Sequence, residues 1–255
     1  MPIFDTHAHY DDSRFDGDRD AVLAALPEAG VELVLDPGCD LPSSRAAAAL
    51  AERYGHVYAA AGIHPENCAG FQDADLVALR QLLAQPKVAA IGEIGLDYYW
   101  AENPPRDFQQ MVFRKQLALA EELDLPVIVH DREAHGDSLS IIREFPAVTG
   151  VFHCFSGSPE MAAELLKRGW YIGFDGPVTY KNARRAPEVA AITPPERMLV
   201  ETDSPYMAPV PVRGKRNDSR NLSYVLETLA VWKGMTPEAL TAITWENGRR
   251  LFRIP

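Results

Sequence analysis

The chain has 255 residues, of which 47% are hydrophobic and 24% are charged, as in ordinary globular proteins rather than fibrous or disordered ones. No apolar run approaches the ~20 residues that cross a bilayer, so we expect no membrane partner. The formal net charge of −11 argues against strong nonspecific binding to nucleic acid, because phosphate contacts supply most of that affinity.

The cysteines and the N-terminal residues bear on the compartment. Cys39, Cys68 and Cys154 lie far apart, which argues against a disulfide framework. The first residues contain neither a basic stretch nor an apolar segment of the kind that directs export. We therefore expect a cytoplasmic protein.

Short apolar, β-rich segments alternate along the chain with longer amphipathic ones. We predict eight strands, over residues 3–9, 31–37, 57–64, 88–95, 126–130, 150–155, 170–175 and 198–203. We predict helices over residues 18–26, 42–54, 73–83, 105–123, 133–145, 159–167, 183–192, 222–232 and 237–251. Apolar strands separated by helices indicate a parallel sheet that is covered by those helices.

Eight βα units of this length predict an α/β fold, a single (β/α)8 barrel of the TIM type. No linker or shift in composition interrupts the chain, so we expect one domain over residues 1–255. The alternative is a doubly wound open sheet, which usually carries a glycine-rich phosphate loop after its first strand. The chain has no such loop there. In barrels of this type the active site lies at the C-terminal ends of the strands.

The first predicted strand carries two histidines. Residues i and i+2 of a strand point to the same face, so His7 and His9 would present their imidazoles side by side, with Asp5 one step below. Histidine is the commonest metal ligand, and this pair would fix two coordination positions. A pair alone is a weak signal, because surface and core histidines are common.

Further reactive side chains fall near the predicted ends of later strands. They are His64, Glu93, His130, His153 and Asp203. Any one of these histidines could simply cap a carbonyl, and Asp203 could cap the turn that Ser204 begins. Together with the first strand, however, they would bring several imidazoles and two carboxylates to one barrel mouth. Divalent cations would relieve the resulting repulsion and desolvation, so we predict a metal site there.

These motifs resemble the TatD family of metal-dependent deoxyribonucleases, which belongs to the amidohydrolase-like barrels. The matching segments run nearly end to end in the order of the family: FDTHAH (4–9), GIHP (62–65), IGEIGLDYY (91–99), LPVIVH (125–130), VFHCFSG (151–157), ETDSPY (201–206) and RGKRN (213–217). The combination is far more specific than any one motif.

The resemblance implies a two-metal hydrolase. The resemblance implies six ligands: His7, His9 and Asp203 around one cation, His130 and His153 around the other, and Glu93 bridging both. Mixed nitrogen and oxygen ligands suit Mg²⁺, Mn²⁺ or Zn²⁺, so the metal stays open. A bound cation would lower the pKa of water towards neutrality, and Asp203 would act as general base beside Glu93 as the second catalytic carboxylate.

Other residues are expected to support the ligands or the substrate. Asp5, Asp97 and Glu201 are candidates to hold the ligand imidazoles from behind. His64 and Glu201 could equally contact substrate or metal-bound water. Basic side chains on the loops after the strands suit phosphate contacts, and these are Arg132, Arg213, Lys215 and Arg216. Exposed bases could stack on aromatic side chains, for which the candidates are Tyr98, Tyr99, Trp100, Phe155 and Tyr206.

The function expected from these residues and the resemblance is a 3′-to-5′ deoxyribonuclease that cleaves single-stranded DNA with a metal-activated water. An alternative keeps the site and changes the bond, for example to the ester of a D-aminoacyl-tRNA. A third possibility is a barrel that uses its metals only as structural supports. We expect a monomer whose partner is a nucleic-acid substrate, with no obligate protein partner.

Overall fold

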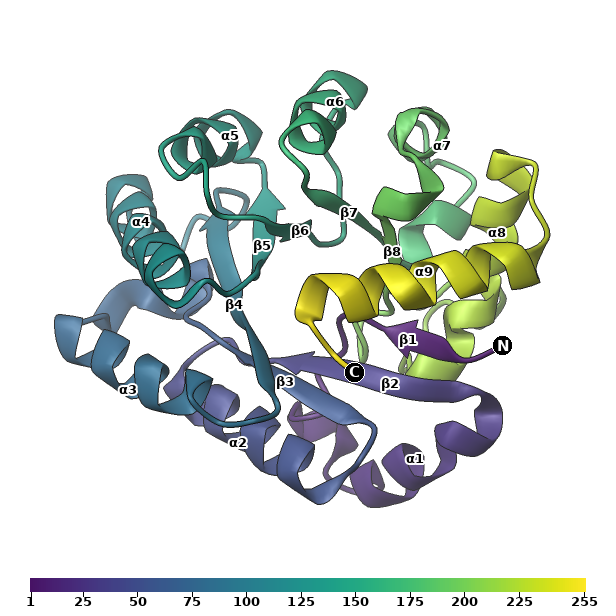
Figure 1. Cartoon of the computed structure of the whole chain (residues 1–255), viewed down its shortest axis with the longest axis horizontal. Coiled ribbons are helices and arrows are strands. Elements are labelled where there is room, and N and C mark those ends of the chain that lie inside the picture. The colour runs from purple at the N-terminus through teal and green to yellow at the C-terminus, as the bar shows by residue number, and fades with distance from the viewer.

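The computed structural model describes residues 1–255 and contains one sheet of eight parallel strands in the order of the sequence (Figure 1). The strands are β1 (Ile3–Asp5), β2 (Val31–Pro37), β3 (Val57–Ala61), β4 (Val88–Asp97), β5 (Val127–Arg132), β6 (Gly150–Phe152), β7 (Tyr171–Phe174) and β8 (Met198–Val200). Each strand pairs with the next from β1 to β8.

Helices follow the strands and surround them. They are α1 (Arg19–Ala25), α2 (Leu41–Arg53), α3 (Asp73–Leu83), α4 (Arg106–Leu123), α5 (His135–Arg143), α6 (Pro159–Lys167), α7 (Arg185–Ile192), α8 (Leu222–Lys233) and α9 (Pro237–Phe252). The predicted (β/α)8 barrel is confirmed. None of these helices has both the length and the apolar composition that crossing a membrane requires.

The barrel closes between its first and last strands. The amide of Thr6 donates to the carbonyl of Val200 over 3.2 Å, and the amide of Asp203 donates to the carbonyl of His7 over 2.9 Å. Ala8 and Ser204 form a parallel bridge just beyond the two strands. Closure therefore brings the two ends of the sheet into contact beside both histidines of the first motif.

Strands β1 and β8 are shorter than predicted. β1 ends at Asp5, whose carboxylate accepts hydrogen bonds from the amide of His7 and from the amide and hydroxyl of Thr202. These side-chain bonds join the segments that follow the two strands, where regular backbone pairing stops. His7, His9 and Asp203 therefore lie just past the strand ends rather than within them.

Apolar side chains fill the N-terminal half of the barrel interior. Phe4, Leu33, Ile128 and Leu199 belong to one buried cluster there, which Leu251, Phe252 and Ile254 also join. Helix α9 crosses this end of the barrel beside β1 (Figure 1). A larger buried cluster lies between the strands and the surrounding helices. The packed floor leaves the opposite, C-terminal mouth for polar residues.

Candidate metal centre

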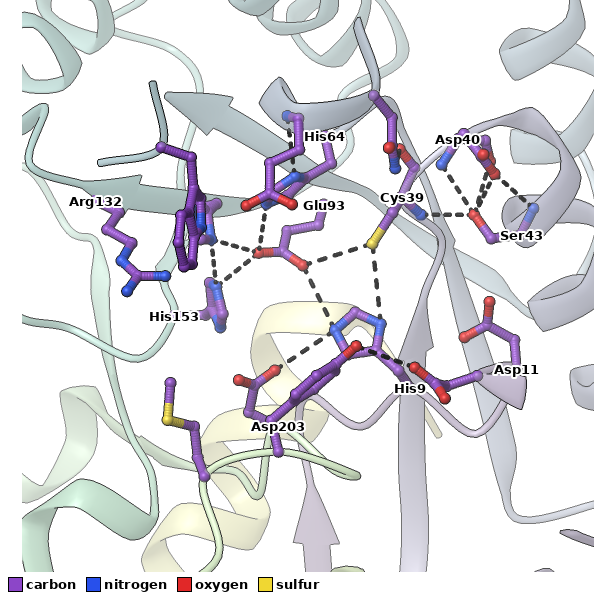
Figure 2. A pocket seen from close by; sticks show the side chains of 17 residues that line it. His9, Asp11, Cys39, Asp40, Ser43, His64, Glu93, Arg132, His153 and Asp203 are labelled. Carbon is purple, nitrogen blue, oxygen red and sulfur yellow. Dashed lines mark hydrogen bonds and ion pairs between the residues drawn. The ribbon is translucent and has the colours of Figure 1, made fainter. Parts of the chain in front are cut away.

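A pocket of about 600 Å³ opens at the C-terminal mouth of the barrel (Figure 2). Half of the residues predicted for the site line it: His9, His64, Glu93, His130, Arg132, His153 and Asp203. His7 lies directly beneath them and is fully buried. Residues from six segments far apart in the sequence therefore converge, because all eight parallel strands end at this mouth.

Four donor atoms form a compact group on one side of Glu93. His7 Nε2 lies 3.1 Å from His9 Nε2, 3.3 Å from Glu93 Oε2 and 3.6 Å from Asp203 Oδ1. His9 Nε2 lies 3.6 Å from Glu93 Oε2 and 3.5 Å from Asp203 Oδ1. Ligand atoms held about 2.1 Å from a cation in a tetrahedron lie about 3.4 Å apart. The spacing and chemistry of this group fit one divalent cation.

The other oxygen of Glu93 faces a second group. Glu93 Oε1 lies 2.9 Å from His130 Nδ1 and 2.7 Å from His153 Nε2, and these two ring nitrogens are 3.3 Å apart. A single carboxylate thus points one oxygen at each of two separate sets of imidazoles. A carboxylate that bridges two cations has this arrangement.

The outer nitrogens of the imidazoles fix which ring nitrogen faces the centre. His130 Nε2 lies 3.1 Å from Asp97 Oδ2, and His9 Nδ1 lies 3.1 Å from the carbonyl of Pro37. Each outer N–H can donate to its oxygen, which turns the inner nitrogen towards the centre, where a cation would take the place of its proton. His153 Nδ1 is 3.6 Å from Glu201 Oε1, which is beyond hydrogen-bonding distance.

Two of the supporting carboxylates have partners other than a ligand imidazole. The sequence pattern predicted that Asp5 would lie below the histidines and support them. Its carboxylate instead accepts hydrogen bonds from the amide of His7 and from the amide and hydroxyl of Thr202, where the barrel closes. Glu201 accepts a 2.5 Å hydrogen bond from the amide of Cys154, directly after His153. Burial raises the pKa of Glu201 to about 8 and that of Asp5 to about 6.

The two carboxylates of the centre itself are ionised. Burial disfavours the charged form of Glu93, but the imidazoles of His153 and His7 outweigh it and hold the pKa of Glu93 well below its ordinary value. Burial likewise opposes ionisation of Asp203, yet the hydrogen bond with His9 and the nearby imidazoles lower its pKa. The centre thus offers two anionic ligands inside a ring of imidazoles.

His64 differs from the other histidines. Its Nδ1 accepts a hydrogen bond from the amide of Glu66 over 3.2 Å, and burial with the nearby His130 lowers the pKa of His64 to about 3. The neutral ring therefore carries its proton on Nε2, which lies 3.6 Å from Glu93 Oε1. A protonated nitrogen cannot bind a metal but can donate to a water or a substrate oxygen at the mouth.

The predicted basic residues are not brought together. Arg132 lines the pocket and lies 3.9 Å from the ring centre of Tyr99. Arg216 instead binds Asp18 with two bonds of 2.6 and 2.7 Å. Neither Arg213 nor Lys215 lines the pocket. Of the predicted aromatic residues, Trp100 and Tyr206 are at the rim.

Sequence reasoning missed Cys39, which faces the ligands. Cys39 Sγ lies 4.0 Å from both His9 Nδ1 and Glu93 Oε2. It follows β2, the one early strand whose end had received no predicted site residue. The rule that sites form at strand ends could have found it, because Pro37 ends that strand.

Comparisons with known proteins agree with this architecture. The family model described as TatD related DNase matches residues 4–253. An uncharacterized metal-dependent hydrolase of Bacillus subtilis, YabD, is 44% identical over 99% of both chains. A protein of Cronobacter sakazakii named 3′-5′ ssDNA/RNA exonuclease TatD is 37% identical over 98% of this chain and 97% of its own.

Solved structures give the same result. The crystal structure of YJJV, a TatD homolog from Escherichia coli K12, superimposes with a TM-score of 0.93 at 33% identity and covers 99% of this chain and 98% of its own. The family match, the relatives and the superposition each span nearly the whole chain. The chain belongs to the family of TatD related DNases and is a metal-dependent hydrolase.

Proposed function

We propose that this protein is a 3′-to-5′ exonuclease that hydrolyses phosphodiester bonds of single-stranded DNA with two divalent cations. The observation that carries the proposal is the orientation of Glu93, whose two oxygens face two separate sets of donors. The exonuclease name of the relative that is 37% identical supports the choice of bond and substrate.

Six side chains would hold the cations: His7, His9 and Asp203 on one side, His130 and His153 on the other, and Glu93 between them. Bound cations of this kind lower the pKa of water and stabilise charge on a phosphoryl oxygen. Asp203 is ionised and would accept the proton of the attacking water. His64 would donate from Nε2 to a phosphate oxygen or a water.

The pocket suits a short stretch of substrate. Arg132 is the only arginine or lysine that lines it, whereas Asp11, Asp40 and Glu66 also line the wall. A wall with so few positive side chains offers few phosphate contacts of its own. Trp100 supplies an aromatic face at the rim. We therefore propose an enzyme that grips the last few nucleotides of a strand.

All the proposed ligands come from one chain, so we also propose that residues 1–255 act as one domain and as a monomer. The metal is proposed to be Mg²⁺ or Mn²⁺, with Zn²⁺ as the competing choice.

The test is digestion of single-stranded DNA labelled at either end. A 5′ label should yield a ladder of shortening fragments with Mg²⁺ or Mn²⁺, and a 3′ label should yield a labelled mononucleotide at once. Glu93→Gln keeps the shape of the side chain and removes its charge, and it should lower the rate by at least about a thousandfold, or about 4 kcal/mol.

Absence of cleavage by the wild type, or equal cleavage by Glu93→Gln, would exclude the proposal. Single-stranded RNA and an aminoacyl-tRNA ester are tested in parallel. Faster hydrolysis of the ester than of DNA would favour the alternative bond.

A further inference from the structure

A second cluster of acidic groups lies beside the proposed metal centre. Asp36, in β2, has a fully buried side chain, and neither of its carboxylate oxygens has a hydrogen-bond partner. Potential ligand atoms of Asp36, Asp11 and His9 all lie within 4.8 Å of one another. Figure 2 shows Asp11 next to His9, across the pocket from Arg132.

The isolation of Asp36 is costly. Burying an ionised carboxylate without a partner costs several kcal/mol, and a second carboxylate at close range adds repulsion. A group of this kind needs either a proton or a cation in place of a protein donor.

A cation satisfies this cluster better than a shared proton does. One proton between Asp11 and Asp36 would give a partner to only one oxygen of Asp36. A cation between them would interact with both carboxylates, and hard divalent cations prefer such oxygen ligands. Asp11 also lines the pocket, so an ion could enter from solvent.

We propose that Asp11 and Asp36 hold a further divalent cation, separate from the two at Glu93. His9 would lie between the sites without serving both, because its Nε2 faces His7 and Asp203 while its Nδ1 faces the carbonyl of Pro37. The preferred ions are those with oxygen ligands, Mg²⁺ or Mn²⁺.

The bound cation would reduce the negative charge along one pocket wall. Asp11, Asp12 and Asp40 line that part of the pocket and would repel a polyanion. A bound dication offsets two of these charges. Binding of this cation does not depend on the reaction, whereas its contribution to DNA binding rests on the proposed function.

Equilibrium dialysis with Mn²⁺ tests the site without any activity measurement. Metal-free protein is dialysed against increasing Mn²⁺ up to millimolar concentrations, and bound manganese is counted by atomic absorption. Wild type should bind one equivalent more than Asp36→Asn and one more than Asp11→Asn. The half-buried Asp11 keeps the test valid if the Asp36 variant fails to fold.

Asp12→Asn is the matched control. Asp12 also lines the pocket, but its carboxylate already accepts from the Tyr206 hydroxyl and the Arg14 amide, so this variant should bind as much Mn²⁺ as wild type. Equal counts in all four proteins would overturn the proposal in favour of a shared proton. Loss of all bound Mn²⁺ in a folded Asp36→Asn variant would also overturn it, because Asp36 would then act only by supporting His9.

Discussion

Replacing Asp97 by asparagine should weaken one cation site and leave the other nearly unchanged. Asp97 is fully buried and uses both oxygens: Oδ2 accepts from His130 Nε2 over 3.1 Å and Oδ1 accepts from the amide of Tyr99 over 2.9 Å. Asparagine has a single acceptor oxygen. It can satisfy only one of these donors, and its NH₂ group must then face the other.

The size of the effect follows from this geometry. An unpaired buried donor costs about 1–3 kcal/mol, and loss of the partner behind a metal-binding histidine lowers metal affinity about 10- to 100-fold. The second figure corresponds to about 1.4–2.7 kcal/mol. Because the inner nitrogen of His130, Nδ1, faces Glu93 Oε1 and His153 Nε2, the loss should fall on that cation and spare the one at His7.

Calorimetric titration of metal-free protein with Mn²⁺ measures the separate affinities. Asp131→Asn is the control, since Asp131 is the next residue in β5 but binds His135 and Ser138 away from the centre. Unchanged affinities in Asp97→Asn, or an equal loss at both sites, would refute the inferred role of Asp97. Melting curves confirm that both variants are folded.

Three further changes give distinct outcomes. Burial raises the pKa of the Glu201 carboxyl to about 8, so between about pH 4.5 and 8 the folded state holds a proton that the unfolded state loses. The stability of the metal-free protein should therefore fall as pH rises across this range. In Glu201→Gln, the melting temperature should depend less on pH across that range. An equal dependence on pH in both proteins would contradict a protonated Glu201. His64→Gln should bind Mn²⁺ like wild type in the calorimetric titration yet cleave DNA about 100-fold more slowly, whereas lost metal would make His64 a ligand. Arg132→Ala should raise KM for single-stranded DNA about tenfold, while Arg216→Ala should leave it within about twofold. A larger effect of Arg216→Ala would show that the loop around Arg216 contacts the phosphates.

The sequence was sufficient to predict elements whose pattern is local. The bounds of β2, α3 and α6 agree with the residues predicted, because apolar periodicity and flanking prolines define them. Placement of reactive residues at the barrel mouth also followed, since parallel strands all end on one side. These are properties of single segments and of the fold class.

Features that depend on contacts between distant segments could not be predicted. The distant partner of Asp5 is Thr202, and the partner of Arg216 is Asp18, so neither role is visible in a local pattern. The proton position of His64 depends on a turn at Glu66. The Asp11–Asp36 cluster joins a loop to a strand that carried no motif.

The contacts that close the barrel between its first and last strands can form only late in folding. Asp5 and Thr202 are bonded across 197 residues of sequence, so this contact is among the last that a chain growing from its N-terminus can make. His7 and His9 are synthesised early but meet Asp203 only when the last strand docks against the first. A nascent or truncated chain that lacks β8 therefore holds an incomplete ligand set, and hydrolase activity would begin only with a finished barrel.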